Sequence, residues 1–194
     1  MVKEIILREL YIDKKQSIKE IANLLGCSSN QVRYWMLKYD IHSRTHSEAT
    51  YVKRNPNGDP FHFRRPITAE EYTLFGVGIG LYWGEGTKAD LNSVRLGNTN
   101  PLIIGKFMDF LTTFFEIEVE DLKFGLQLFS DIDIDLALDF WTKQLNIEVG
   151  QINKPVITKS GAIGTYRQKS QYGVMTVMYH NKKLRDLLIS LLPM

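Results

Sequence analysis

The order of apolar and polar residues divides the chain into three parts. Residues 1–45 place apolar side chains at the spacing of short helices, residues 46–68 show no sustained periodicity, and residues 69–194 mix helical with strand-like segments. We therefore expect an α+β protein with a small all-helical N-terminal domain, a linker and a larger mixed domain.

Two adjacent helices are predicted in the first part because each begins with a capping box. The boxes are Ser17–Glu20 and Ser28–Gln31, and a short turn containing Gly26 separates the two helices. This arrangement is typical of a helix-turn-helix, and the segment resembles the helix-turn-helix of resolvases and many bacterial regulators. A first helix over 2–12 completes the domain, with an expected apolar face of Ile5, Ile6 and Leu10.

The third helix, predicted to continue to about Tyr39, has an apolar and a polar face. Val32, Trp35 and Met36 are expected to point inward. Asn and Gln pair well with adenine and Arg with guanine in the major groove, so we expect the polar face to contact duplex DNA. Its DNA-binding candidates are Ser29, Asn30, Gln31, Arg33, Tyr34 and Lys38. The alternative is a protein-contact module with a solvated polar face.

The segment 46–68 is basic and contains three prolines and the pair Asn57–Gly58, which favours a linker between domains. Basic arms of this type often contact phosphates or the minor groove. The expected DNA contacts in and beside it are Arg44, Lys53, Arg54, Arg64 and Arg65. A simple polar tether is the alternative, but it explains less well the aromatic residues Tyr51, Phe61 and Phe63.

The third part begins with a glycine-rich helix that Thr68 can cap and that ends near Glu85. Strands are predicted at 87–90, 93–97, 122–129, 151–159 and 172–179. Helices are predicted at 101–115, 131–145 and 181–192.

The glycines of the first helix in this part are unusual, because each glycine in a helix interior costs about 1 kcal/mol relative to alanine. Gly76, Gly80 and Gly84 recur every four residues and form one stripe. A stripe without side chains lets another backbone approach closely, so we expect two copies of this helix to pack along it. The alternative is a buried glycine-rich helix followed by an acidic turn that arose by chance.

The segment 78–86, GIGLYWGEG, resembles the LAGLIDADG motif of homing endonucleases and of their non-cleaving regulator relatives. Gly80, Leu81, Gly84, Glu85 and Gly86 fit the motif well, and the other positions fit loosely. The resemblance covers about 69–192 and implies a saddle-shaped αββαββα domain, in which the helix at 131–145 is an insertion. It also implies that Glu85 is a metal ligand. Together with the carbonyl of Gly84 at the helix end, Glu85 could hold Mg²⁺ or Mn²⁺.

A chain with one motif needs two copies for a two-site centre, which implies a homodimer joined through the motif helix. The expected function is a site-specific, metal-dependent endonuclease of double-stranded DNA, of homing type. The family usually supplies a strand lysine near the metals, and Lys154 and Lys159 are the catalytic candidates. A non-cleaving DNA-binding transcriptional regulator on the same scaffold is the alternative, and a protein-interaction adaptor is a third, weaker one.

The net charge of +2 hides a strong segregation of charge. Residues 1–68 hold 12 basic and 7 acidic residues, whereas 69–194 hold 12 and 15. Within the second part, 109–148 carries 2 basic and 10 acidic residues, and 149–185 carries 7 basic residues and no acidic one. This pattern indicates one face turned to a polyanion. On the predicted sheet, the DNA-binding candidates are Arg95, Lys154, Lys159, Arg167 and Lys169.

Several classes of protein are not expected from this sequence. The single cysteine, Cys27, excludes an internal disulfide and a cysteine-based zinc cluster, and it fits a reducing compartment. No apolar run approaches the 18 or so residues of a membrane span, and the first ten residues lack the apolar core of a signal peptide. We therefore expect a cytoplasmic protein without a membrane segment. GxGxxG and GxxxxGK[ST] are absent, so no small-molecule cofactor is expected.

Overall fold

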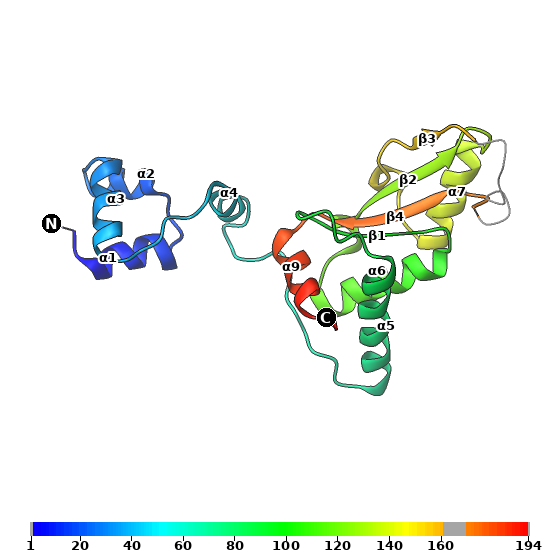
Figure 1. Ribbon diagram of the computed structural model, residues 1–194, viewed down its shortest axis with the longest axis horizontal. Helices are drawn as coiled ribbons and strands as arrows, with labels where there is room; N and C mark the ends of the chain where they lie inside the picture. The colour runs from blue at the N-terminus through cyan, green and yellow to red at the C-terminus, as the bar shows by residue number, and fades with distance from the viewer. Residues whose placement is uncertain (1, 161–169, 194) are drawn as a thin grey trace. The chain divides into compact units, whose positions relative to one another are not determined.

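The computed structural model describes residues 2–160 and 170–193 (Figure 1). Contacts within the chain define two compact units, Met1–Pro60 and Phe61–Met194. Each unit has its own hydrophobic core. Within the described ranges, no helix combines the length and the apolar content that a membrane span needs.

The first unit is helical. Its elements are α1 (Glu4–Arg8), the π-helical turn η1 (Glu9–Asp13), α2 (Ile18–Leu24), α3 (Ser29–Lys38) and α4 (His46–Arg54). Both predicted capping boxes form, because the hydroxyls of Ser17 and Ser28 accept backbone N–H groups three residues on and the reciprocal bonds are present. The starts of the second and third predicted helices are therefore confirmed.

The core of the first unit confirms the predicted inner face of α3 but not that of the first helix. Val32 and Met36 are buried. In the first helix, Leu7 and Leu10 are buried, whereas Ile5 is 74% exposed. The reason is the register of the helix: Leu7, Leu10 and Tyr11 form the i, i+3, i+4 face that meets α2 and α3. Ile6 is exposed as well, so the predicted pairing of Ile5 and Ile6 with Leu10 is wrong.

Helix α4 lies in the segment for which the sequence pattern predicts only a linker. It begins with a third capping box, in which the Thr45 side chain accepts the Glu48 N–H and the Glu48 carboxylate accepts the Thr45 N–H. No residue of α4 is buried. An unburied helix has no apolar periodicity, which is why the pattern does not reveal it.

The second unit contains a four-stranded sheet in the order β1-β4-β2-β3. Strand β4 pairs antiparallel with both β1 and β2, and β3 pairs parallel with β2. The strands are β1 (Val94–Asn98), β2 (Lys123–Phe129), β3 (Val156–Thr158) and β4 (Val174–Tyr179). The helices are α5 (Ala69–Glu85), α6 (Pro101–Phe115), α7 (Ile134–Leu145) and α9 (Lys182–Ser190), with 3₁₀ turns at Val119–Asp121 and Val149–Gln151. The expectation of a mixed α and β protein is confirmed.

Two of the predicted strands differ from the structure. Residues 87–90 form no strand, and only an isolated bridge joins Gly86 to Leu96. The Asp90 carboxylate instead accepts the Asn92 N–H at 2.8 Å, which turns the chain. The strand predicted at 151–159 is limited to Val156–Thr158, because the 3₁₀ turn precedes it and Pro155 cannot donate to a neighbouring strand.

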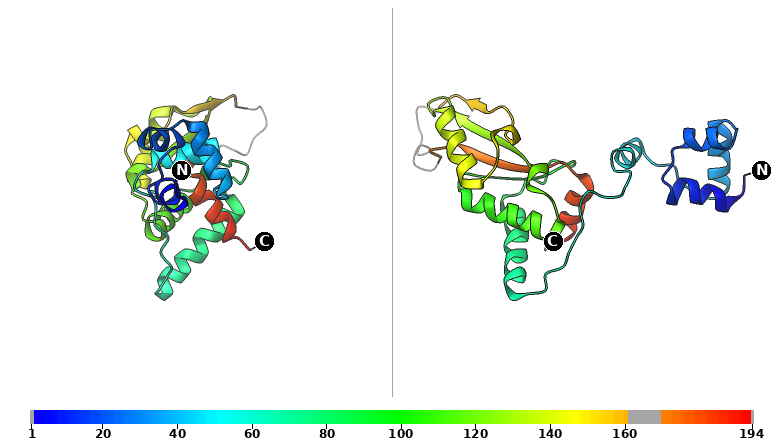
Figure 2. Two further views of the ribbon diagram at one scale, coloured as in Figure 1. Left: turned by 90° about the vertical axis from the view of Figure 1, so that its left-hand side faces the viewer. Right: turned by 180° about the vertical axis from the view of Figure 1, so that it is seen from behind.

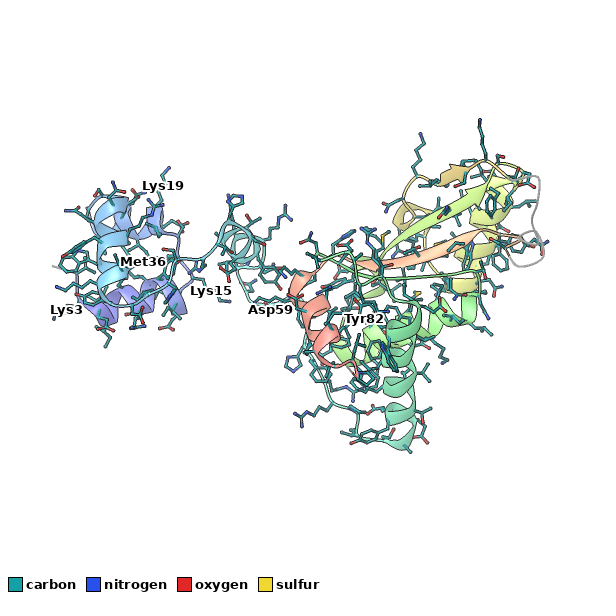
Figure 3. The ribbon with its side chains drawn as sticks, viewed as in Figure 1. Lys3, Lys15, Lys19, Met36, Asp59 and Tyr82 are labelled. Carbon is teal, nitrogen blue, oxygen red and sulfur yellow. The ribbon has the colours of Figure 1, made fainter. Side chains whose placement is uncertain are left out.

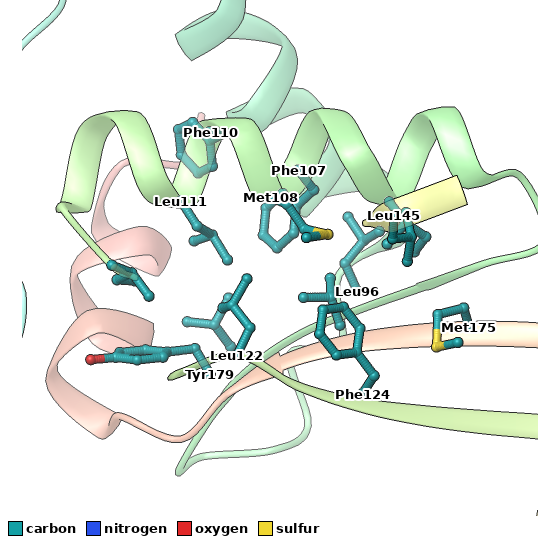
Figure 4. Packing of buried hydrophobic residues seen from close by; sticks show 14 of the residues in the cluster. Leu96, Phe107, Met108, Phe110, Leu111, Leu122, Phe124, Leu145, Met175 and Tyr179 are labelled. Carbon is teal, nitrogen blue, oxygen red and sulfur yellow. The ribbon is translucent and has the colours of Figure 1, made fainter. Parts of the chain in front are cut away.

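The core of the second unit lies between one face of the sheet and the helices. Alternate strand residues such as Leu96 and Phe124 point toward α6, where they meet Phe107 and Leu111 (Figure 4). Buried residues of α5, α6, α7 and α9 all belong to this one core. Both views of the ribbon show α5 and α6 on the same side of the sheet (Figure 2). The opposite face of the sheet does not contribute to the core.

The chain enters the second unit along the C-terminal end of α6. The N–H of Arg64 donates to the Phe114 carbonyl at 2.8 Å, and the rings of Phe61 and Phe63 contact Phe115. The end of the segment predicted as linker is thus packed onto the second core, which accounts for its aromatic residues.

Gly78 is the point of closest approach between α5 and α6. A Cβ there would lie well inside 3.0 Å of the Phe110 ring, close to the α6 backbone where the ring cannot yield. We expect Gly78→Ala to lower the free energy of unfolding of the second unit by about 1–3 kcal/mol, as overpacking does. Urea denaturation measures this value.

The matched control is Gly105→Ala in α6, where a Cβ meets nothing within 4 Å. This change should leave the stability unchanged or raise it by up to about 1 kcal/mol, since alanine favours the helix. Equal effects of the two substitutions would contradict the close packing of α5 on α6.

Candidate nucleic-acid interface and motif helix

Helix α5 carries the segment that resembles the LAGLIDADG motif. The Thr68 hydroxyl accepts the Glu71 N–H at its start, and the Gly86 N–H donates to the Tyr82 carbonyl at 3.0 Å at its end. One side of the helix buries Gly78 and Tyr82 against α6. On the other side, the described residues leave the glycines open.

The predicted glycine stripe lies on this uncovered side. A Cβ added at Gly76, Gly80 or Gly84 would meet nothing within 4 Å. Tyr72 and Trp83 beside the stripe are 63% and 54% exposed. The exposed residues of α5 between 72 and 84 carry no charge, and we call this set the uncharged face of α5: Tyr72, Thr73, Gly76, Val77, Gly80, Trp83 and Gly84.

Glu85 is the exposed last residue of α5, where its carboxylate meets the negative end of the helix dipole. The ammonium of Lys88 offsets the negative helix end: it donates a hydrogen bond to the Trp83 carbonyl and lies 5.7 Å from the centroid of the Tyr82 ring. Lys88 is a residue of this site that the sequence pattern does not reveal, because it lies past the helix in a segment predicted as strand.

Glu85 can serve as a ligand for a hard cation only with help from outside the chain. Among the described residues, no three His, Cys, Asp or Glu side chains come together. Mg²⁺ typically keeps several waters and binds one or two carboxylates plus substrate phosphates. One carboxylate with the carbonyl of Gly84 at the helix end fits that requirement, provided that water, phosphate or a second copy completes the shell.

A polar layer lies beneath the end of α5. The Tyr82 hydroxyl is buried without a hydrogen-bond partner in the described part of the chain, and its burial raises the pKa of the phenol. Arg185 of α9 donates to the Lys88 carbonyl at 2.7 Å and pairs with Asp186 at 3.1 Å. The loop after Glu85 is thereby tied to the C-terminal helix.

The sheet face that points away from the core is the second candidate surface. The register places Arg95 of β1 beside Met178 of β4, and Met178 beside Lys123 of β2. Two cations thus flank β4 on one face, about 10 Å apart from backbone to backbone. Lys123 is exposed, and the Arg95 guanidinium is partly exposed.

The next row of this face is small or polar, because Gly97, Thr176 and Gly125 lie side by side across three strands. In the row beyond it, Gln127 lies between Val174 and Val156, and its amide donates to the Thr158 hydroxyl at 3.3 Å. Met178, between Arg95 and Lys123, is 6% exposed. We call the residues of this face that point away from the core the uncovered sheet face: Arg95, Gly97, Lys123, Gly125, Gln127, Phe129, Val156, Thr158, Val174, Thr176 and Met178.

Arg95, a predicted DNA contact, is held in place by its own loop. Its Nε lies 2.8 Å from both the Asp90 carboxylate and the Ser93 hydroxyl. Hydrogen bonds from Ser93 and from the Asn92 N–H lower the pKa of Asp90, followed by the charge of Arg95. The guanidinium is therefore oriented on the sheet before any ligand arrives.

The predicted catalytic lysines, Lys154 and Lys159, are exposed and flank β3 at the far edge of the sheet. Gly86, next to Glu85, bridges to the opposite edge, so about four strand spacings, roughly 19 Å, separate them from Glu85. The two lysines and Glu85 do not converge within one chain. The cause is the parallel pairing of β3 outside β2, which the pattern of the sequence does not show. Arg167 and Lys169 lie outside the described residues.

In the first unit, α3 presents the expected polar face. Asn30, Arg33 and Tyr34 are exposed. The other three predicted contacts are less accessible or already have a partner within the unit. Ser29 is half-buried, and the side-chain Oε1 of Gln31 accepts the Ser28 N–H. The Lys38 ammonium lies 5.0 Å from the Trp35 ring centroid. Leu37, 83% exposed, lies among them and was not predicted.

Two of the predicted basic contacts have structural partners instead. Arg44 donates to the carbonyls of Tyr11, Lys15 and Gln16, so its guanidinium closes the end of η1 and is not a free phosphate contact. Lys53, Arg54 and Arg65 are exposed, as expected for residues that contact a ligand.

Arg64 is the second such residue. Its guanidinium binds the Glu71 carboxylate through two hydrogen bonds of 2.9 and 3.1 Å, and it lies 5.5 Å from the Phe114 ring centroid. This arginine therefore joins the entering chain to the first turn of α5, and its contact with DNA stays a prediction.

Comparison with protein-family models, with curated proteins and with solved structures gave no match for this chain.

The Arg64–Glu71 pair predicts a pH dependence. Hydrogen bonds from Arg64, then from the Ile67 N–H, lower the pKa of Glu71 from 4.5 to about 2. Because the folded-state pKa is depressed, the stabilisation is complete above pH 4.5 and is lost as the pH falls toward 2. We expect the melting temperature of the second unit to fall over this range in the wild type, and to fall less in Glu71→Gln.

Glu120→Gln removes an exposed carboxylate with no ion pair among the described residues and is the control. Its melting curve should follow that of the wild type at every pH. If Glu71→Gln did so too, the pair would have no role in the acid sensitivity.

Proposed function

We propose that the chain is a site-specific endonuclease of double-stranded DNA, of homing type, that requires a divalent metal and acts as a homodimer through α5. The observation that carries the proposal is the position of Glu85. It is an exposed carboxylate where the uncharged face of α5 ends and where the chain passes through Gly86 onto the sheet that bears Arg95 and Lys123.

The uncharged face of α5 supports the dimer. An exposed helix side with three glycines and two large aromatic side chains is unusual for a surface in contact with water. Packing two copies of it about a twofold axis would bury the aromatic residues and bring the two C-terminal ends of α5 together. Each end would supply one Glu85 and one Gly84 carbonyl.

The order of elements supports the scaffold. When α7 and β3 are set aside as an insertion, the order is α5, the Gly86 bridge, β1, α6, β2, β4 and α9. The isolated bridge at Gly86 stands where the first strand of an αββαββα domain would be. An uncovered, partly basic sheet face is the surface that such a domain would place on DNA.

Each residue has a defined role in this proposal. Glu85 and the Gly84 carbonyl would hold Mg²⁺, which would polarise the phosphate and lower the pKa of a bound water. Arg95 and Lys123 bind phosphates along the uncovered sheet face. Lys88 neutralises the helix end, so that the charge of Glu85 remains available for a cation. On the first unit, the exposed polar face of α3 reads bases in the major groove.

A non-cleaving DNA-binding regulator is the second candidate. Two observations favour it: among the described residues Glu85 belongs to no group of three or more His, Cys, Asp or Glu side chains, and Lys154 and Lys159 lie at the far edge of the sheet. The uncovered sheet face and α3 are sufficient for binding without chemistry.

Glu85→Gln separates the two candidates. We expect the wild type to produce discrete double-strand cuts with Mg²⁺, and none with EDTA, in a plasmid library that spans the sequence flanking its own gene. Changes in the second shell of a metal site alone cost about 10–100-fold, so loss of the ligand should lower cleavage by more than about 100-fold. Affinity for duplex DNA in EDTA should stay within about twofold, because Glu85 contacts the metal and not the phosphates.

Glu118→Gln, a change of the same charge far along the sequence, should leave both properties unchanged. A parallel loss of binding in Glu85→Gln would count against the metal role. If the wild type bound duplex DNA with a steep salt dependence but cut nothing, the regulator would be the correct function.

Gly80→Leu tests the dimer. A leucine in the middle of the uncharged face should keep the two α5 helices apart, so sedimentation should show monomers at concentrations where the wild type is dimeric. Gly105→Leu, at an equally open helical glycine of α6, is the control and should remain dimeric. A dimeric Gly80→Leu would show that α5 is not the interface.

A further inference from the structure

The first unit contains a cleft of about 790 Å³ between the turn that precedes α2 and the helix α4. Residues 14–20 line one side, and Ala49, Thr50, Val52 and Lys53 line the other. Four lysines line it, and we call it the lysine cleft: Lys14, Lys15, Lys19 and Lys53. Arg44 lines it as well, and Glu20 is the acidic residue of the lining.

Most of the positive charge in the lysine cleft is not neutralised by the part of the chain that the structure describes. Lys14 pairs with Glu9 at 2.8 Å. Lys15, Lys19 and Lys53 are exposed and make no ion pair among the described residues. Figure 3 shows Lys15 and Lys19 on the side of the three-helix bundle that is nearest to α4.

Glu20, the acidic residue of the cleft, is already hydrogen-bonded to the backbone at the start of α2. The Glu20 carboxylate accepts the Ser17 N–H at 2.7 Å as part of the capping box. Hydrogen bonds from Ser17 lower the pKa of Glu20 first, and the charges of Lys53 and Arg44 add to the effect. Lys53 of α4 is therefore close to the start of α2, across the cleft.

The turn that carries Lys15 is held in an uncommon conformation. Its φ is 54°, in the left-handed region, which costs a residue with a side chain about 1–2 kcal/mol. Arg44 fixes this turn, because it donates to the Lys15 carbonyl at 3.0 Å and lies 4.1 Å from the centroid of the Tyr11 ring. Strained backbone of this kind concentrates at binding sites. Lys15 is one of the residues that line the cleft.

Helix α4, the other wall of the cleft, contributes no side chain to either hydrophobic core. Its nine residues include none that is buried, and a helix shorter than about 12–15 residues is marginal on its own in water. A ligand that contacts Lys53 as well as Lys15 and Lys19 would supply the missing attachment between α4 and α2.

We propose that the lysine cleft binds the phosphodiester backbone of one strand of duplex DNA, with Lys15, Lys19 and Lys53 each contacting a phosphate. The assignment rests on the DNA binding proposed above and adds a contact surface distinct from α3 and from the uncovered sheet face. Flexible ammonium groups spaced around an open cleft suit a repeating anion, since each acts as a point charge and requires no fixed geometry from its partner.

The salt dependence of binding tests this assignment. We would measure the affinity for a fluorescent duplex between 50 and 300 mM NaCl for the wild type, for Lys15→Gln, Lys19→Gln and Lys53→Gln, and for the triple variant. Each phosphate contact contributes about 0.9 to the slope of log K against log salt concentration. The triple variant should therefore lose about 2.7 from the slope, three times 0.9. Lys53→Arg, which keeps the charge, should retain the wild-type slope.

Lys3→Gln is the matched control, because Lys3 lies at the other end of the unit (Figure 3). If the three cleft variants gave the slope of Lys3→Gln while the wild type bound DNA, the cleft assignment would be overturned and the DNA binding would stand. No affinity of the wild type for DNA at 50 mM salt would overturn both. A reduced slope in a protein that never cuts DNA would support the cleft and count against the nuclease.

A second experiment distinguishes the DNA backbone from a free anion as the ligand of the lysine cleft. Inorganic tripolyphosphate is the probe, titrated into the wild type and the triple variant by calorimetry. Binding of tripolyphosphate tighter than that of the duplex, lost in the triple variant, would overturn the assignment to the DNA backbone. Weak binding that salt abolishes in both proteins would support it.

Discussion

The second unit depends on the close contact of α5 with α6 at Gly78. This glycine lets the Phe110 ring lie against the backbone of α5, and Tyr82 one turn later stacks on Phe107 with ring centroids 6.0 Å apart. The contact fixes the rotation of α5 about its own axis. Gly76, Gly80 and Gly84 consequently face outward, and Glu85 arrives at the edge of the sheet. The glycines of one helix therefore have two separate roles, one inside the fold and one on its surface.

Strand pairing then decides which charges share a face. The antiparallel pairing of β4 with β1 and β2 puts Arg95 and Lys123 on the side opposite the core. The parallel pairing of β3 moves Lys154 and Lys159 to the far edge. The same distinction applies to arginines: Arg44 of the first unit and Arg64 of the second bind groups of their own chain, whereas Arg33 and Arg54 remain exposed. Exposure and partners, rather than charge alone, separate candidate phosphate contacts from structural residues.

Local features of the fold were predictable from the sequence. The capping boxes at Ser17 and Ser28 involve residues three apart, so their hydrogen bonds follow from the spacing alone. The α6 start at Asn100–Pro101 and the amphipathic α7 and α9 have equally local causes. The spacing of Gly76, Gly80 and Gly84 predicted that they share one side of α5, and in the structure all three are exposed.

What could not be predicted depends on contacts between distant segments. Lys123 was missed because the exposed side of β2 is decided by its partners, β4 and β3. The buried face of the first helix was predicted wrongly, because residue spacing does not show whether the side with Ile5 or the side with Leu7 meets α2. Helix α4 was missed for the opposite reason: its capping box at Thr45 is local, but no apolar stripe accompanies it. Lys88 acts through a carbonyl five residues before it in a turn that was expected to be a strand.

The absence of buried residues in α4 has a consequence for how such a chain can change over time. Neither hydrophobic core includes a side chain from α4, so insertions, deletions and substitutions in this segment leave the folding of both units intact. Loop-closure entropy also changes slowly with length, by roughly 0.6 kcal/mol for each doubling. The length of this segment is therefore a property that mutation can adjust at little thermodynamic cost to either core, and what such changes alter is the wall of the lysine cleft that α4 provides.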